Sequence, residues 1–325
     1  MKYNRIIVIA FAFILSFFVI LFIAAYPFIT IQYQPLKFPE VNITQDVDEY
    51  LKVQESKHLD IAQNAHKKIL WHNIKNKEKT NYSFVFIHGG FATGYQHEST
   101  VIKIAKSLNA NLFITRLSGH GVPYEGSKFI KFDNLLKDAV EAVEVGSKIG
   151  KKVIVMGYSL GGALVSIVAS DPVASENIDN LILLAPAHSN MTLNFLVISL
   201  ISFLFGGIDV DYPKLFNVDK NKWDNYWSKK VDREQLLEMW KVLSMSDQIG
   251  FDNKKVPLLL IYNKFDRVIT QQGIKKNFAK WKGPKMLFDL DTQDGGPMNH
   301  DLIGLLNPNQ DDVFVDVITK WVNSN

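Results

Sequence analysis

The segment with the clearest chemical potential is Gly-Tyr-Ser-Leu-Gly-Gly at residues 157–162. It follows the run Lys-Val-Ile-Val-Met at 152–156, which is apolar after its first residue, and precedes a helix-forming run at 163–168. This order predicts a strand, a sharp turn and a helix with Ser159 at the apex. Glycine is favoured beside such a crowded turn because it has no Cβ. The turn would raise the Ser159 hydroxyl above the sheet as a nucleophile and aim the Leu160 N–H at the position of an oxyanion.

A serine nucleophile needs an imidazole to accept its proton and a carboxylate to orient that imidazole. On a turn of this kind, the carboxylate and then the histidine follow the serine along the chain. Of the eight histidines, only His188 and His300 follow Ser159. His188 comes before any acid-bearing loop and is predicted to be a cap or pocket-rim residue. His300 lies in the loop after the last apolar run and is the predicted base.

The carboxylate is expected after the next-to-last strand. The short continuous apolar run at 257–262 is typical of a strand buried on both faces. Asp266 lies in the loop that follows it and is the predicted acid. The alternatives are Asp289, inside a predicted strand, and Asp291 and Asp294, close to His300 in sequence, and all three are interpreted as solvated carboxylates.

A second oxyanion donor is expected from the loop after an earlier strand. The run at 84–87 leads into His-Gly-Gly at 88–90. Gly90 is the first candidate donor and Phe91 the second. His88 precedes the serine and is predicted to fix this loop rather than to act as a base.

Residues 82–323 resemble the α/β-hydrolase superfamily, and within it the monoacylglycerol lipase and lysophospholipase-like branch. The resemblance rests on the His-Gly-Gly turn, the segment Arg-Leu-Ser-Gly-His-Gly at 116–121, the serine turn, Asp266 and His300. It implies a mostly parallel sheet with helices on both faces and a helical cap. It also implies that His120 has a structural role. The sequence departs from the commonest family pattern at 88–93, which leaves the second oxyanion donor open.

The resemblance implies hydrolysis of carboxylic esters, with small lipids such as monoacylglycerol or lysophospholipid as substrates. Neither a metal nor an organic cofactor is implied. A thioesterase, an acyltransferase or a small peptidase would use the same three residues, so these alternatives stay open. A membrane-tethered binding protein that keeps the fold is the non-enzymatic alternative, and a complete set of three residues in order argues against it.

Residues 6–25 form an apolar run with one serine as its only polar member, and its length matches a bilayer core. Lys2 and Arg5 precede it, which predicts a single-pass membrane anchor with a cytoplasmic N-terminus and an extracytoplasmic catalytic domain. A cleaved signal peptide, giving a secreted protein, is the alternative. Its apolar core would be shorter, about 7–15 residues, and Ile23 stands where a cleavage site after Ala25 prefers a small residue.

The pattern of apolar runs divides the chain into an anchor at 1–31, a linker and helical extension at 32–81, and a catalytic domain at 82–325. The extension is predicted to contain a helix at 46–68 and an early strand and turn at 71–79. The catalytic domain alternates strands and helices, which predicts a largely parallel sheet. Strands are expected near 84–87, 112–115, 152–156, 180–184, 257–262 and 285–290, and helices near 97–108, 132–147, 160–170, 271–281 and 308–323.

No strand–helix pair is apparent at 187–253, and this interval is the predicted cap. The apolar stretch 193–205 within it fits either a lid over an acyl pocket or a helix packed on the domain.

The composition excludes several classes of function. The 325-residue chain has a formal net charge of +3, which gives no electrostatic basis for nucleic-acid binding. It has no cysteine, so disulfides and thiolate metal sites are excluded. The oligomeric state does not follow from the sequence.

Overall fold

The computed structural model describes residues 36–188, 191–192, 230–249 and 255–325, and single positions at 9, 12, 15, 16, 19, 197, 200, 206, 208 and 209. Apart from these single positions, the predicted anchor at 6–25 and the stretch 193–205 fall outside the described residues, as does most of the predicted cap. Within these ranges, no helix combines the length and the apolar character needed to cross a membrane.

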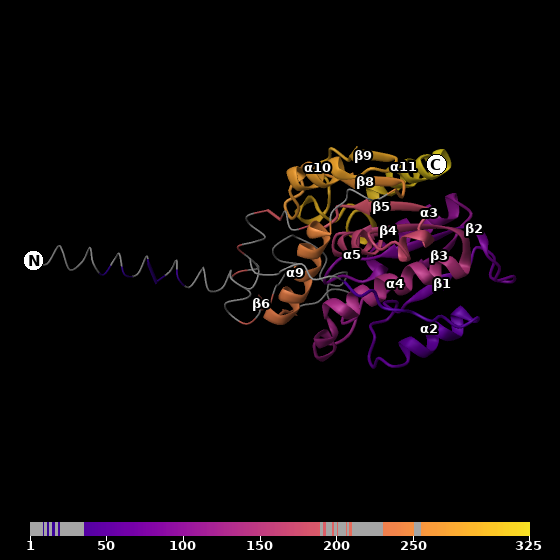
Figure 1. The fold of residues 1–325 in the computed structure, drawn as a ribbon, viewed down its shortest axis with the longest axis horizontal. Helices are drawn as coiled ribbons and strands as arrows, with labels where there is room; N and C mark the ends of the chain where they lie inside the picture. Colours follow the sequence, from indigo (N-terminus) through magenta and orange to yellow (C-terminus); the bar gives the residue numbers. More distant parts are fainter. Residues whose placement is uncertain are drawn as a thin grey trace, which may run out of the picture.

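A seven-stranded sheet forms the centre of the fold, in the order β1-β3-β2-β4-β5-β8-β9 (Figure 1). Only β1 runs antiparallel to its neighbour. Residues at or next to the carboxyl ends of neighbouring strands are paired: Ile87 with Gly157, Tyr158 with Leu184, and Leu184 with Ile261. The carboxyl ends of β2, β4, β5 and β8 therefore meet at one edge of the sheet. In such sheets ligands bind outside that edge. The strands are β1 (Lys68–Leu70), β2 (Thr80–Ile87), β3 (Asn111–Ile114), β4 (Gly150–Tyr158), β5 (Asn180–Leu184), β8 (Leu258–Tyr262) and β9 (Lys285–Asp289).

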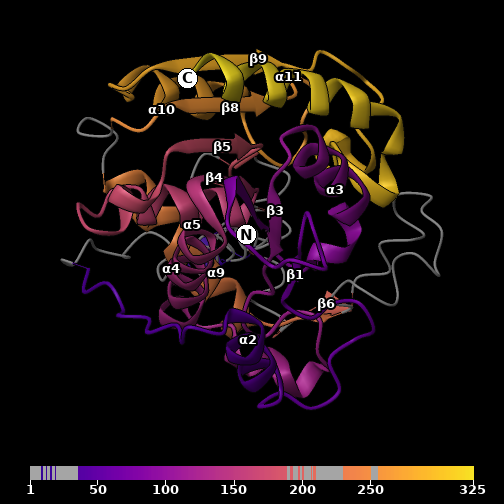
Figure 2. The same cartoon turned by 90° about the vertical axis from the view of Figure 1, so that its right-hand side faces the viewer.

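Helices cover both faces of this sheet (Figure 2). One face carries α4 (Phe132–Ile149), α5 (Leu160–Val168) and α10 (Gln271–Lys280), and the other carries α3 (Glu98–Ser107) and α11 (Asp311–Ser324). Outside the first layer, α9 (Arg233–Gln248) packs against α5 and α4, and α2 (Val47–Glu55) lies against β1. The remaining short elements are β6 (Ile208–Asp209), β7 (Lys230–Val231), η1 (Gly94–His97), η2 (Tyr124–Phe129), η3 (Ala174–Asn177), η4 (Pro297–Asn299), η5 (Gly304–Leu306) and η6 (Pro308–Gln310).

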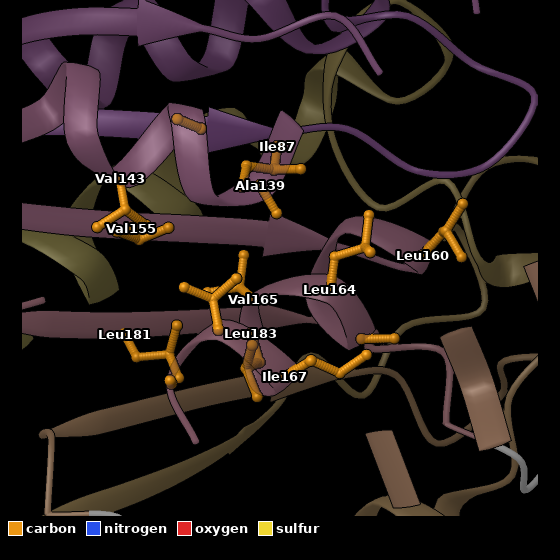
Figure 3. Packing of buried hydrophobic residues seen from close by; sticks show 14 of the residues in the cluster. Ile87, Ala139, Val143, Val155, Leu160, Leu164, Val165, Ile167, Leu181 and Leu183 are labelled. Carbon is orange, nitrogen blue, oxygen red and sulfur yellow. The ribbon is translucent and has the colours of Figure 1, made fainter. Parts of the chain in front are cut away.

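The core on the α4 and α5 face holds the strand that carries Ser159. Side chains of β2, β4 and β5 interlock there with the two helices (Figure 3). Burial of a large aliphatic side chain contributes about 1.5–3 kcal/mol, so this face strongly stabilises the junction between β4 and α5. The contributing residues include Ile87, Val155, Leu181 and Leu183 from the strands and Ala139, Val143, Leu164, Val165 and Ile167 from the helices.

The predicted strands and helices of the 82–325 region are present and differ only at their ends. The helix predicted at 46–68 is wrong in length, because α2 ends at Glu55. Beyond it, Asp60 and Asn64 adopt the left-handed conformation, with φ of 58° and 69°, which an α-helix does not accommodate. The early strand was predicted within 71–79, and the structure places it just before that range, at β1 (Lys68–Leu70).

A helical cap was predicted at 187–253, but the position of the helix α9 within it was not. It begins at a capping box in which Asp232 accepts a hydrogen bond from the Gln235 N–H. Its buried face mixes Gln235, Ser244 and Ser246 with apolar residues. That mixture hides the apolar repeat by which a helix is recognised in a sequence.

Candidate active site

Ser159 lies at the junction of β4 and α5, as the strand–turn–helix pattern predicts. Its φ of 51° and ψ of −114° are strained for a residue with a side chain. Backbone hydrogen bonds hold it there: the Ser159 N–H donates to Leu184 O and the Ala187 N–H donates to Ser159 O, both at 2.9 Å. The flanking glycine is required by space, since a Cβ on Gly161 would lie 2.3 Å from the Ile87 carbonyl oxygen.

The structure brings Ser159, His300 and Asp266 into one hydrogen-bonded row. His300 Nε2 lies 3.0 Å from Ser159 Oγ, and His300 Nδ1 lies 2.7 Å from Asp266 Oδ2. The other carboxylate oxygen of Asp266, Oδ1, accepts hydrogen bonds from the N–H groups of Val268 and Ile269 at 2.7 and 2.9 Å. The Asp266 side chain is only 1% exposed, so these bonds orient it firmly toward the imidazole.

The alternative carboxylates are engaged elsewhere. Asp289 accepts hydrogen bonds from the Tyr262 hydroxyl and the Lys264 N–H. Asp291 pairs with the Lys264 ammonium, and Asp294 is exposed. Asp266 is therefore the carboxylate that the fold places on the imidazole.

Two opposing effects act on the pKa of His300. Burial disfavours its charged form and lowers the pKa, whereas the Asp266 carboxylate attracts the imidazolium and accepts its hydrogen bond. The carboxylate outweighs burial, and the pKa of His300 is raised above its ordinary value. An imidazole with a raised pKa is a stronger proton acceptor for a serine hydroxyl.

Two side chains behind His300 were not singled out from the sequence. The Tyr158 hydroxyl donates to the His300 carbonyl oxygen at 2.8 Å and lies 3.3 Å from Asp301 Oδ1. The Tyr158 ring also packs between His97 and His300, with centroids 4.8 and 5.4 Å away. Burial raises the pKa of Asp301 to about 6, against the opposing attraction of His300. The only sequence signals were the adjacency of Tyr158 to Ser159 and of Asp301 to His300.

Two of the predicted oxyanion donors, Leu160 and Gly90, lie close to each other. Leu160 is the first residue of α5, and the leading N–H groups of a helix have no partner within it. A Cβ on Gly90 would lie 3.5 Å from Leu160 Cδ2 and only 2.3 Å from Met239 Cε, so the Met239 methyl of α9 lies against this turn. Phe91, the second candidate, has a left-handed φ of 61°.

His88 holds the loop behind this turn, which confirms its predicted loop-fixing role. His88 Nε2 accepts the Leu117 N–H at 3.0 Å, and Nδ1 lies 2.8 Å from the Gly89 carbonyl oxygen. An imidazole with these two partners is neutral, protonated on Nδ1. Burial, with the nearby His120, lowers the pKa of His88 well below its ordinary value.

His120 and His188 are also buried. His120 packs edge-on against the His88 ring at 5.3 Å, and burial lowers its pKa to about 4. His188 Nδ1 lies 3.0 Å from the Ser246 hydroxyl of α9. In the described part of the chain, no group of three His, Asp or Glu side chains is arranged to hold a metal ion.

Comparison with known proteins finds chains that are similar to this one. Residues 84–296 match the profile of the alpha/beta hydrolase family, while a search of curated proteins gives no significant match. A structure from work on LipS and LipT, two metagenome-derived lipolytic enzymes, is 13% identical with a TM-score of 0.62, over 82% of this chain and 100% of that chain.

Two further structures are lipases. The monoacylglycerol lipase of Paleococcus ferrophilus is 14% identical with a TM-score of 0.56, over 80% of this chain and 98% of its own. A soluble variant of the Saccharomyces cerevisiae monoglyceride lipase, bound to a substrate analogue, is 12% identical with a TM-score of 0.60, over 90% and 99%. At these identities the likeness establishes a shared fold.

Proposed function

Because the chain belongs to the alpha/beta hydrolase family, we propose that it is a serine hydrolase of carboxylic esters in which Ser159, His300 and Asp266 act together. The observation that carries the proposal is the row of hydrogen bonds from Ser159 Oγ through the imidazole to Asp266. Each distance lies within the reach that proton transfer requires. The lipolytic structures that share the fold support an ester as the substrate.

The reaction follows from this geometry. Ser159 Oγ attacks the ester carbonyl carbon as its proton moves to His300 Nε2, and Asp266 stabilises the imidazolium through Nδ1–H. The Leu160 and Gly90 N–H groups stabilise the oxyanion, with Phe91 as the alternative donor to Gly90. The imidazolium then protonates the leaving alcohol. Water, deprotonated by the same imidazole, releases the acyl group and regenerates Ser159.

We propose lipid-like esters, such as monoacylglycerols or lysophospholipids, as the substrate class. The Met239 methyl against Gly90 supplies an apolar contact beside the proposed oxyanion site. Each methylene moved from water into an apolar pocket contributes about 0.8 kcal/mol, equivalent to about fourfold in kcat/KM.

The test is a panel of 4-nitrophenyl esters and monoacylglycerols of graded acyl length, with the Ser159→Ala protein as the background control. The value of kcat/KM is expected to rise by about fourfold per methylene until the pocket is filled. A preference for acetate would contradict the lipid proposal and leave a small-ester hydrolase.

A fluorophosphonate probe separates the enzymatic proposal from a binding protein that keeps this fold. It is expected to label Ser159 covalently, because it needs the activated hydroxyl. Thioesters, amides and acceptor alcohols added to the same assay distinguish a thioesterase, a peptidase or an acyltransferase from an esterase.

We also propose that residues 6–25 anchor the protein in a membrane with the catalytic domain outside the cytoplasm. The apolar length of this run and the preceding Lys2 and Arg5 support the proposal. An alkaline phosphatase fused after Asn325 is expected to be active, and the intact protein should resist alkaline carbonate extraction. An inactive reporter on a full-length protein would contradict this orientation, and a shortened soluble product would indicate a cleaved signal peptide.

A further inference from the structure

We propose that residues 46–70 of the N-terminal extension, which lie before the family match at 84–296, position residues of the active site. Through a buried ion network they position the loop at 116–121 and, through His120 and His88, the Gly89–Gly90 turn beside Ser159. The inference rests on the proposed function, because it assigns the positioned turn to oxyanion stabilisation.

The first link is a buried ion pair between the extension and the loop. Glu55, the last residue of α2, accepts two hydrogen bonds from Arg116, at 2.8 Å from Nη2 and 3.0 Å from Nε. Arg116 is 1% exposed and Glu55 is 8% exposed. The Lys67 N–H also donates to Glu55, at 2.9 Å. Without Glu55, the guanidinium would be a buried charge without its counter-ion, which strongly destabilises its surroundings.

The second link connects the extension to α4. The Lys67 ammonium donates to Asp138 at 2.9 Å and also pairs with Glu141. The Tyr50 hydroxyl donates to Glu141 at 2.7 Å. Burial opposes the charge on Lys67, but the two carboxylates outweigh it and raise the pKa of Lys67, so the amine stays cationic. Asp138 in turn accepts the Ser118 N–H of the loop at 2.6 Å.

The extension therefore supplies both the anion that pairs with Arg116 and the cation that pairs with two carboxylates of α4. It also contacts the far end of the loop directly, where the Ala62 N–H donates to the Gly121 carbonyl oxygen at 2.8 Å. A Cβ on Gly121 would lie 2.8 Å from the Ala65 Cβ, so there is no space between extension and loop.

The third link runs from the loop to the turn. Arg116 Nη1 donates to the His120 carbonyl oxygen at 3.2 Å, and the His120 ring packs against the His88 ring. His88 then joins loop and turn, since it accepts the Leu117 N–H and its Nδ1–H donates to the Gly89 carbonyl. A Cβ on Gly89 would lie 3.2 Å from Ser159 Cβ, so a shift of this turn changes the geometry at the nucleophile.

Small displacements at such a turn have large kinetic effects. Loss of one oxyanion donor lowers kcat by about 10²–10³, and a misplacement of about 1 Å costs about 10². Glu55→Gln keeps the shape of the side chain and removes its charge. We expect it to lower kcat by about 10- to 100-fold with KM changed by less than about threefold, since a positioning defect acts on the transition state.

The experiment uses the full chain and compares Glu55→Gln with Glu49→Gln, a matched change in the same helix at an exposed ion pair with Lys52. Active sites are titrated with a fluorophosphonate so that kcat refers to folded enzyme. The double variant Glu55→Gln/Arg116→Met removes the unpaired charge but also the bond to His120. It is expected to regain the thermal stability lost in Glu55→Gln while kcat stays low. Recovery of kcat together with stability would show a purely structural role and overturn the proposal.

Hydrogen exchange gives a readout that needs no turnover. Glu55→Gln is expected to increase amide exchange in peptides covering 88–91 and 116–121, and Glu49→Gln is not. If Glu55→Gln does not fold, Glu55→Asp, which keeps the charge and weakens the contact, takes its place in both measurements. Increased exchange with no ester hydrolysis by the unmodified protein would support the positioning and reject the proposed function. Hydrolysis with unchanged exchange and unchanged kcat in the Glu55 variant would overturn the positioning alone.

Discussion

Replacement of Ser159 by alanine is expected to abolish ester hydrolysis, with a loss in kcat of roughly 10⁶, while the protein stays folded. The change removes only the hydroxyl that lies 3.0 Å from His300 Nε2. The backbone hydrogen bonds that hold the turn, to Leu184 and from Ala187, do not involve the side chain. The measurement is kcat on the preferred ester, with thermal unfolding followed by circular dichroism.

Ser166→Ala is the matched control, because Ser166 lies in α5, the helix that begins directly after Ser159, and its hydroxyl donates to the Gly162 carbonyl oxygen at 2.8 Å. It is expected to cost about 1 kcal/mol of stability and to leave kcat near that of the unmodified enzyme. A folded Ser159→Ala protein that still hydrolyses esters at a substantial fraction of the original rate would remove Ser159 from the mechanism.

Asp266→Asn is expected to lower kcat by about 10³–10⁴. An asparagine N–H facing His300 Nδ1 would place the imidazole proton on Nε2, where the ring can no longer accept the Ser159 proton. The variant also loses the interaction that raises the pKa of His300. Activity needs the neutral imidazole, so kcat/KM of the unmodified enzyme rises with pH through a pKa above 6.5. The residual kcat/KM of the variant is also expected to increase with pH, but the midpoint of this increase should lie at a lower pH than in the unmodified enzyme.

Asp291→Asn and Asp294→Asn serve as controls and should keep near full activity, since neither carboxylate contacts the imidazole. The pH profile of kcat/KM and the value of kcat are measured for all three variants. If Asp266→Asn were nearly fully active while one of the other two was inactive, the assignment of the acid would be wrong.

Much of the fold follows from local sequence patterns. The strand β8 and the segment of β4 from Val153 to Met156 are continuously apolar runs, which is what burial on both faces of a parallel sheet selects. The turn at Ser159 can be recognised in the sequence because its glycines stand where a Cβ would clash, as Gly161 does against the Ile87 carbonyl. The chain order of Ser159, Asp266 and His300 follows from the topology, and the structure places these three side chains in contact.

Other features depend on contacts between distant segments, which leave little trace in one sequence. Glu55, the last residue of α2, has its partner in Arg116, 61 residues further along the chain. The position of α9, with Met239 against Gly90, comes from packing onto α5 and not from an apolar repeat.

The fold class and the candidates Ser159, Asp266 and His300 could be predicted from the amino-acid sequence, because strand burial, glycine sterics and chain order are local or topological properties. The groups that surround these three residues became apparent in the folded chain. The Tyr158 hydroxyl on the His300 carbonyl joins residues 142 positions apart, and the Glu55–Arg116 pair joins the extension to the catalytic domain. A buried polar group needs a hydrogen-bonding partner, and the folding of the chain determines which distant residue provides it.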